Sequence, residues 1–299
     1  MTAGPDSLAK ESPTGATDPY VPSARRLARE RLERARSRRS VLIAVASTLV
    51  TAVVLVLIAV NSPGWPRTRE TFFDPAVARE ALPAVLRGLW LNVRLLFVCG
   101  TLALLLGLVV AVARTLKGPA LLPVRALAAA YTDFFRGLPL IVTILALVFG
   151  VPALRLQGVT TDPLYLAGTA LVLTYSAYLA EVFRAGIESV HPSQRAAARS
   201  LGLSTTQTMR HVVLPQAVRR VVPPLLNDLV SLQKDTSLVS IGGVVEAVYA
   251  AQIVVGKEFD FTPYVVAGLI FVALTIPMTR FTDWITARTE RRRAQGGLA

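Results

Sequence analysis

The sequence predicts an all-α integral membrane protein with six transmembrane helices, and three observations carry this prediction. Apolar residues make up 53% of the 299 residues and charged residues only 17%, whereas soluble domains hold about a quarter of charged residues. Six segments are apolar enough to cross about 30 Å of hydrocarbon, which takes about 20 helical residues. Lys and Arg outnumber Asp and Glu by 32 to 19 and flank the apolar segments, where they indicate orientation rather than nucleic-acid binding.

The N-terminal part of the chain predicts a polar tail followed by one membrane helix. Residues 1–39 begin rich in Pro, Ser, Gly and Thr, which favours disorder, and end in a basic run. The first transmembrane helix is expected at residues 40–61, around the apolar run Val41 to Val60. A cleaved signal peptide is the alternative interpretation. The apolar run is too long for one, and no small-x-small cleavage site follows it.

The five other spans are predicted from their apolar runs. An external loop with an amphipathic segment, residues 62–87, leads to spans at residues 89–113, 126–151, 164–183, 224–245 and 264–285. Basic residues precede the first span and fill the tail at residues 288–299, so both termini are expected in the cytoplasm. The loop 184–222 is then cytoplasmic, and the loops 152–163 and 246–263 lie outside.

The third span is interrupted by Arg136-Gly137-Leu138-Pro139. Interrupted helices in transporters expose backbone groups to a transport path, so this break is a candidate part of such a path. A simple kink at the proline is an equally good interpretation.

The cytoplasmic loop is expected to fold as two short helices joined by a tight turn. Ser193 is the predicted N-cap of an alanine-rich first helix, and Gly202 suits the left-handed position that ends it. Ser204 and Gln207 have the spacing of a capping box for the second helix, which Pro215 is expected to end.

Polar side chains within spans four and five mark the candidate translocation pathway. Polar and charged groups inside the bilayer are costly, so they usually face a bundle interior or a water-filled path. Lys234 and Asp235 form either an interhelical ion pair or a solute contact, and Glu181 is expected to pair with Arg184 on one helix face. The candidates are Thr174, Tyr175, Ser176, Glu181, Asn227, Asp228, Ser231, Lys234, Asp235, Thr236 and Ser237.

Motifs for enzymatic chemistry are missing from the sequence. It contains no G-x-x-x-x-G-K-[ST] phosphate loop, and its two histidines, His191 and His211, have no cysteine or carboxylate cluster at ligand spacing. The single cysteine, Cys99, lies in an apolar run. We therefore expect no catalytic site, no metal site and no cofactor bound by this chain.

The spacing Ala197-Ala198, Gly202 and Val212-x-Leu214-Pro215 resembles the EAA loop of permease subunits of ABC importers. The segments "GLWLNV" from Gly88, "DFFRGLPLIV" from Asp133 and "SAYLAEVFRAGI" from Ser176 are similar to the polar amino acid uptake permeases in particular. The resemblance covers about residues 82–288, so the first span is an addition to a core of five. It implies a loop that couples to ATPases through Ser193, Ala196, Ala197, Ala198, Gly202, Leu214 and Pro215.

The resemblance also implies the partners and the location of the chain. It points to cytoplasmic ATPase subunits that use ATP and Mg²⁺, a second permease subunit, identical or related, and an external solute-binding protein. The solute would be a polar amino acid, either of the glutamate or glutamine type or basic. The chain would be located in the cell membrane of a prokaryote. A secondary transporter or channel coupled to ions through span five is the alternative, and a membrane anchor is a third reading.

One residue departs from the family pattern. Ala196 stands where the EAA motif has its glutamate. With Ser193 as N-cap, position 196 would be N3, where a glutamate closes a capping box, so alanine is expected to cost about 0.5 to 1 kcal/mol of helix stability.

Overall fold

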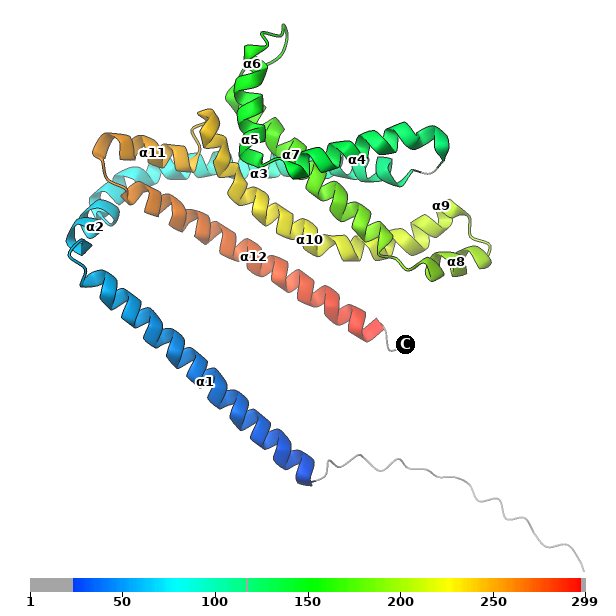
Figure 1. The fold of residues 1–299 in the computed structure, drawn as a ribbon, viewed down its shortest axis with the longest axis horizontal. Coiled ribbons are helices and arrows are strands. Elements are labelled where there is room, and N and C mark those ends of the chain that lie inside the picture. Colours follow the sequence, from blue (N-terminus) through cyan, green and yellow to red (C-terminus); the bar gives the residue numbers. More distant parts are fainter. Residues whose placement is uncertain (1–23, 117, 297–299) are drawn as a thin grey trace, which may run out of the picture. The chain divides into compact units, whose positions relative to one another are not determined.

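The computed structural model describes residues 24–116 and 118–296, and every regular element in these ranges is helical (Figure 1). The N-terminal 23 residues of the predicted tail lie outside the described residues. The chain divides into two units, Met1–Trp65 and Pro66–Ala299, and each is described by itself.

Most of the described part of the first unit is one long helix, α1 (Ala24–Val60). All side chains from residue 40 to residue 60 are exposed within it, as expected of a helix whose apolar surface faces lipid. Two of its hydroxyl groups are satisfied locally, since Ser47 and Thr48 both donate to the carbonyl of Ala44, at 2.9 and 2.8 Å. The predicted first span is therefore helical, and the helix extends upstream through the basic run.

The second unit begins with α2 (Trp65–Phe72) and α3 (Pro75–Thr115). Asp74 caps α3 by accepting from the backbone N–H of Ala76 at 2.7 Å, and Pro75 is suited to the first helical position. Most of the segment 62–87, which was predicted as an external loop with an amphipathic segment, is thus helical. The capping signal at Asp74-Pro75 was present in the sequence.

The predicted break after Arg136 is a sharp bend. Helix α4 (Leu122–Gly137), which follows the short η1 (Pro119–Leu121), and α5 (Leu140–Leu145) belong to segments that meet at 106°. Pro139 disfavours helical geometry in the residue before it, and Leu138 is indeed extended, with φ −87° and ψ 133°. Residues 126–151 are therefore not one straight helix. A π-helical turn, η2 (Ala146–Gly150), and α6 (Val151–Ala153) complete the segment.

The C-terminal half is built from long helices joined by short ones. They are α7 (Pro163–Glu188), α8 (Pro192–Ser200), α9 (Thr205–Thr208), the π-helical turn η3 (Met209–Val213), α10 (Leu214–Asp235), the 3-10 helix η4 (Thr236–Gly242), α11 (Ala247–Glu258) and α12 (Thr262–Gly296). Helices α10 and α12 pack side by side, and α8 and α9 lie beyond the start of α10 (Figure 1).

Two sequence expectations about these elements are wrong. Residues 246–263 are not simply a loop, because they contain α11, which a 47° bend separates from the preceding helical segment. Pro215 does not end the second helix of the cytoplasmic loop, because α9 runs through η3 into α10. A proline clashes with the carbonyl four residues earlier, and the wider π turn just before Leu214 accommodates it.

The core of the second unit lies mainly between α3 and α7. Small and branched residues interlock there, including the fully buried Ala103, Ala167 and Leu171. A Cβ on Gly107 would lie 2.9 Å from the carbonyl oxygen of Ser176, so the two backbones approach closely. Small residues at such contacts are typical of helix pairs in membranes.

By length and composition, four described segments are able to cross a membrane, or six if each bent pair is one span. The four are residues 40–60, 65–115, 163–188 and 262–289, and the bent pairs are residues 119–153 and 205–258. The predicted all-α membrane fold is confirmed, while the number of crossings depends on how the bent pairs sit in the bilayer.

Candidate functional site

A polar cavity lies where the bend between α4 and α5 faces α7 and α10. Its volume is about 360 Å³. The backbone of the bend forms one wall, and side chains of α7 and α10 form the others. The lining residues are Leu138, Pro139, Leu140, Thr174, Tyr175, Tyr178, Asp228, Ser231 and Asp235.

Five of the predicted pathway residues come together in this polar cavity: Thr174, Tyr175, Asp228, Ser231 and Asp235. The Tyr175 hydroxyl donates to Asp235 Oδ2 at 2.7 Å and so fixes one carboxylate. Asp228 Oδ2 and Thr174 Oγ1 are buried and have no hydrogen-bond partner among the described residues. Unsatisfied buried groups are rare in native structures, and here they line a cavity, which suggests a ligand.

A cation lies beside the same cavity. The guanidinium carbon of Arg136, in the last turn of α4, is 5.9 Å from the ring centroid of Tyr178, in the range of a cation–π contact. The site thus offers two carboxylates from α10 and one guanidinium next to the bend. This arrangement of both charge signs complements a zwitterion.

The other pathway candidates lie elsewhere. Ser176 Oγ is 2.6 Å from the Tyr131 hydroxyl of α4, and Ser237 donates to the Lys234 carbonyl at 2.7 Å. Asn227 and Lys234 are exposed and do not line the cavity. Among the described residues neither Lys234 nor Asp235 forms an interhelical ion pair, and Asp235 accepts a hydrogen bond from Tyr175.

A buried polar network that sequence reasoning missed holds the bend between α10 and α11. The Asn92 amide of α3 donates to Thr236 Oγ1 at 3.1 Å and to Glu246 Oε2 at 3.0 Å, and its oxygen accepts from the N–H of Ala247. Glu246 is fully buried and caps α11 through the N–H of Tyr249. The sequence signal for this network was Asn92, a polar residue within an apolar run. Glu246 was not recognised as its partner because residues 246–263 were predicted to lie in an external loop.

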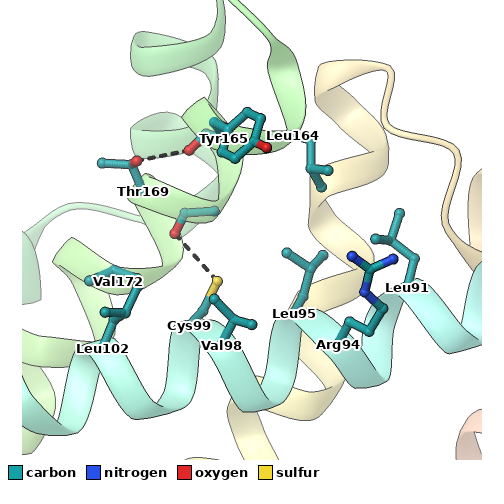
Figure 2. Close-up of a pocket in the computed structure, with 11 residues that line it drawn as sticks. Leu91, Arg94, Leu95, Val98, Cys99, Leu102, Leu164, Tyr165, Thr169 and Val172 are labelled. Atoms are coloured by element: carbon teal, nitrogen blue, oxygen red, sulfur yellow. Dashed lines mark hydrogen bonds between the residues drawn. The ribbon is translucent and has the colours of Figure 1, made fainter. Parts of the chain in front are cut away.

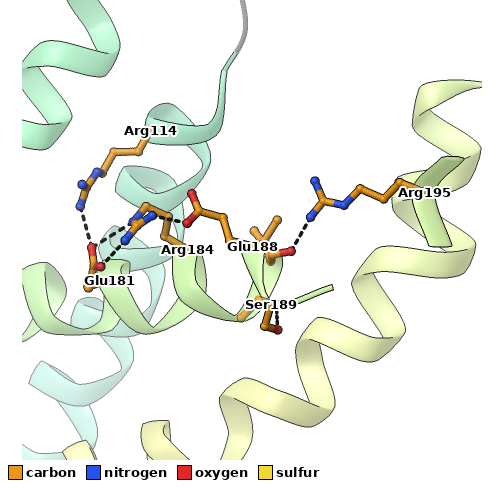
Figure 3. Close-up of polar contacts among 8 residues, drawn as sticks. Arg114, Glu181, Arg184, Glu188, Ser189 and Arg195 are labelled. Carbon is orange, nitrogen blue, oxygen red and sulfur yellow. Dashed lines mark hydrogen bonds and ion pairs between the residues drawn. The ribbon is translucent and has the colours of Figure 1, made fainter. Parts of the chain in front are cut away.

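An ion cluster anchors the C-terminal end of α7 (Figure 3). Glu181 pairs with Arg114 of α3 at 2.8 Å and with Arg184, as predicted, and Arg184 also pairs with Glu188. Arg195 of α8 donates to the carbonyl of Ile187 at 2.5 Å. We call Arg114, Glu181, Arg184 and Glu188 the ion cluster. Through it and Arg195, α3, α7 and α8 are connected at one end of the bundle.

Helix α8, the first helix of the loop 184–222, starts earlier than predicted. Its N-cap is His191, whose Nδ1 accepts from the N–H of Ser193 at 3.2 Å, and Pro192 takes the first helical position. Ser193 as N-cap is therefore wrong. Position N3 is Gln194, so Ala196 lies in the second turn, and a glutamate there closes no capping box.

The end of α8 and the start of α9 follow the sequence prediction. Gly202 has a φ of +83°. Its N–H bonds to the carbonyl of Arg199 at 3.0 Å, and that of Leu203 to Ala198 at 3.1 Å, which is the bonding of a Schellman motif. Ser204 and Gln207 form both bonds of the predicted capping box.

The two-helix loop presents a small apolar surface. Ala196, Ala197 and Gly202 are exposed, and the Leu201 side chain is 84% exposed, whereas Ala198 is buried. We call Ala196, Ala197, Leu201 and Gly202 the docking face. Leu214 and Pro215 are also exposed, but they lie in the first turn of α10. The motif residues thus divide into a surface set and the buried Ala198.

Residues 103–291 match the family model described as binding-protein-dependent transport system inner membrane component. The probable amino-acid ABC transporter permease protein YckA of Bacillus subtilis is 37% identical over 216 residues, which cover 72% of this chain and 91% of the relative. The arginine transport system permease protein ArtQ of the same organism is 31% identical over 199 residues, 66% of this chain and 89% of its own.

Solved structures agree with these matches. The crystal structure of an amino acid ABC transporter with histidines aligns with a TM-score of 0.67 at 29% identity, over 72% of this chain and 98% of that one. The MetNI methionine ABC transporter in an inward-facing conformation shares the fold, with a TM-score of 0.56 at 22% identity over 69% and 95% of the two chains. This chain belongs to the family of inner membrane components of binding-protein-dependent ABC transport systems, as a multi-pass permease subunit.

Proposed function

We propose that this chain forms half of the translocation pathway of an ATP-driven importer of polar amino acids. The observation that carries the proposal is the polar cavity, which gathers Asp228, Asp235 and the neighbouring Arg136 beside the bend. An amino acid has an ammonium and a carboxylate, and these groups complement the two aspartates and the arginine. The relatives described above, which include an arginine transport permease, support this substrate class.

The energy would come from other subunits. This sequence has no phosphate loop, so ATP and Mg²⁺ would be bound by cytoplasmic ATPase subunits that dock on the docking face. The connection between α8 and the end of α7, through Arg195 and Ile187, would carry ATPase closure to the helices of the polar cavity. A second permease subunit and an external solute-binding protein complete the importer. Both chain termini are proposed to lie in the cytoplasm of a prokaryotic cell.

The direct test reconstitutes the chain with its ATPase and its solute-binding protein in liposomes. Uptake of labelled amino acids is measured with ATP inside, without ATP, and with an imposed proton or sodium gradient. ATP-dependent uptake that needs the binding protein supports the proposal. Uptake driven by an ion gradient alone, without the ATPase, would identify a secondary transporter instead.

The docking face gives a second test with the same proteins. Ala197→Asp places a charge on an exposed apolar patch, so ATPase association and uptake should be lost while the fold is kept. Leu201→Ser should weaken association in the same direction by removing an exposed anchor. Thr161→Asp adds the same charge to the exposed loop before α7 and should change neither. Normal co-purification of Ala197→Asp with the ATPase would contradict this docking site.

A further inference from the structure

A second cavity of about 420 Å³ lies between α3 and the N-terminal half of α7. Leu95, Val98 and Leu102 of α3 and Val172 of α7 form most of its wall, as Figure 2 shows. It shares no lining residue with the polar cavity. We call it the α3–α7 groove. Its walls complement a hydrocarbon chain rather than a polar solute.

Arg94 lines one end of the α3–α7 groove (Figure 2). Its side chain is exposed, and among residues 24–116 and 118–296 no hydrogen bond or ion pair involves it. Tyr165, on the facing helix, is 65% exposed and also lines the groove. A guanidinium without a protein partner at the end of an apolar groove is free to bind an anionic group outside the chain.

The position of Arg94 along α3 matches the depth of a lipid headgroup. At 1.5 Å per residue, Arg94 lies about 30 Å from Thr115 at the other end of the helix, which is about the thickness of the hydrocarbon layer. If the Thr115 end is at one membrane surface, Arg94 is near the other. Leu102 then lies about 12 Å deeper, toward the midplane. The groove therefore extends from headgroup depth into one leaflet.

We propose that the α3–α7 groove binds an anionic phospholipid. The Arg94 guanidinium binds the headgroup phosphate with two parallel N–H donors, a geometry suited to this side chain. Tyr165 lies at interface depth, where tyrosine is favoured, and one acyl chain fills the space between Val98 and Val172. This proposal does not depend on the solute that the chain transports.

The test measures lipid selectivity of the full chain in nanodiscs of phosphatidylcholine. Acyl-chain spin-labelled phosphatidylglycerol or phosphatidylcholine is added, and electron paramagnetic resonance gives the immobilised fraction of each. The intact chain should prefer phosphatidylglycerol by about fivefold, the effect of one basic residue at the surface of a membrane. Arg94→Gln should abolish the preference, and Arg94→Lys should retain part of it.

Two further variants make the result specific. Arg87→Gln removes another exposed arginine of the same helix, which does not line the groove, and should keep the preference. Val98→Trp fills the groove with the charge intact and should lower the immobilised fraction of both lipids. Equal binding of the two lipids by the intact chain, or equal losses in Arg87→Gln and Arg94→Gln, would overturn the proposal. Disulfide formation between two Arg94→Cys chains would do the same, because a second copy would then cover the groove.

Discussion

At Gly88 the backbone of α11 comes so close to α3 that no side chain fits. A Cβ at this position would lie 2.5 Å from the backbone nitrogen of Ala247, which donates to Asn92. Gly88→Ala should therefore displace the start of α11 and lower the free energy of unfolding by about 1 to 3 kcal/mol. Thermal unfolding in detergent measures the change.

Gly256 on α11 is the matched control. A Cβ there meets no atom within 4 Å, and its backbone angle is not in the left-handed region. Gly256→Ala should leave the melting temperature unchanged or raise it, because alanine favours a helix. Equal effects of the two substitutions would show that the contact at Gly88 is not tight.

Asp228 lines the polar cavity, and its charge is not needed for a contact within the described part of the chain. Its buried Oδ2 has no partner among the described residues, so Asp228→Asn should not reduce thermal stability. Loss of a charge-assisted bond to the solute should raise the concentration for half-maximal uptake by about tenfold or more. Asp133→Asn, on an exposed position of α4, should transport normally. An unchanged concentration dependence in Asp228→Asn would remove Asp228 from the solute site.

Polarity within an apolar span was enough to find Tyr175, Asp228 and Asp235 from the sequence. The same signal also selected Asn227 and Lys234, which are exposed, because composition does not say which way a helix face points. Glu246 was missed since its burial depends on Asn92, which is distant in the sequence. The sequence therefore predicted which spans contribute to the candidate site, but not which of their side chains line the cavity.

The C-terminal end of α7 depends on the ion cluster around Glu181. This carboxylate contacts Arg114 and Arg184, and its side chain is 24% exposed. Glu181→Gln should lower stability by about 1 to 2 kcal/mol, less than for a fully buried pair. It should also lower the stimulation of ATP hydrolysis by solute, because α7 is then held less firmly to α3. Unfolding and ATPase assays on the reconstituted complex measure both effects.

The control for this prediction is a salt bridge whose two charges are exposed to solvent. Arg280 and Asp283 on α12 are 3.8 Å apart and 81% and 62% exposed, so Asp283→Asn should change stability by less than about 1 kcal/mol. If Glu181→Gln keeps full solute-stimulated ATP hydrolysis, the ion cluster stabilises the bundle but plays no part in coupling.

Element boundaries were predictable where a local signal acts alone. The Ser204–Gln207 capping box and the left-handed Gly202 lie where the sequence places them. His191 replaced Ser193 as N-cap because Pro192 fits the first helical position, and this competition between neighbouring signals has no clear winner in the sequence. Pro215 does not end the helix, because the π-helical turn before it accommodates the proline ring.

Because the chain divides into two units, we expect that the first unit, which contains α1, is not needed for transport. Residues 66–299 form one compact unit, and the family match, residues 103–291, lies wholly within it. A chain that lacks residues 1–61 should insert in the same orientation, since the basic loops remain, and should take up solute at the same rate per molecule. Uptake and membrane abundance are compared with those of a chain that lacks only residues 1–39. Loss of uptake at normal abundance would assign α1 an essential role.

For the molecule as a whole, the all-α membrane fold followed from apolar runs and charge placement. The bent pairs did not, because a hydropathy pattern records how apolar a segment is and not whether it is straight. In the first unit, the apolar run was sufficient to predict the helix at residues 40–60.

The continuity of α9, η3 and α10 has a mechanical consequence. From Thr205 to Asp235 the chain is one continuous helical rod of about 45 Å, with the docking face beside one end and the polar cavity along the other. A helix resists axial compression, so a partner that pushed on the loop would displace Asp228 and Asp235 together with the whole rod. The rod is most compliant where its ladder of backbone bonds is interrupted, at η3 and at Pro223-Pro224. The displacement of the cavity end of α10 would therefore depend on how much the helix bends at these two places.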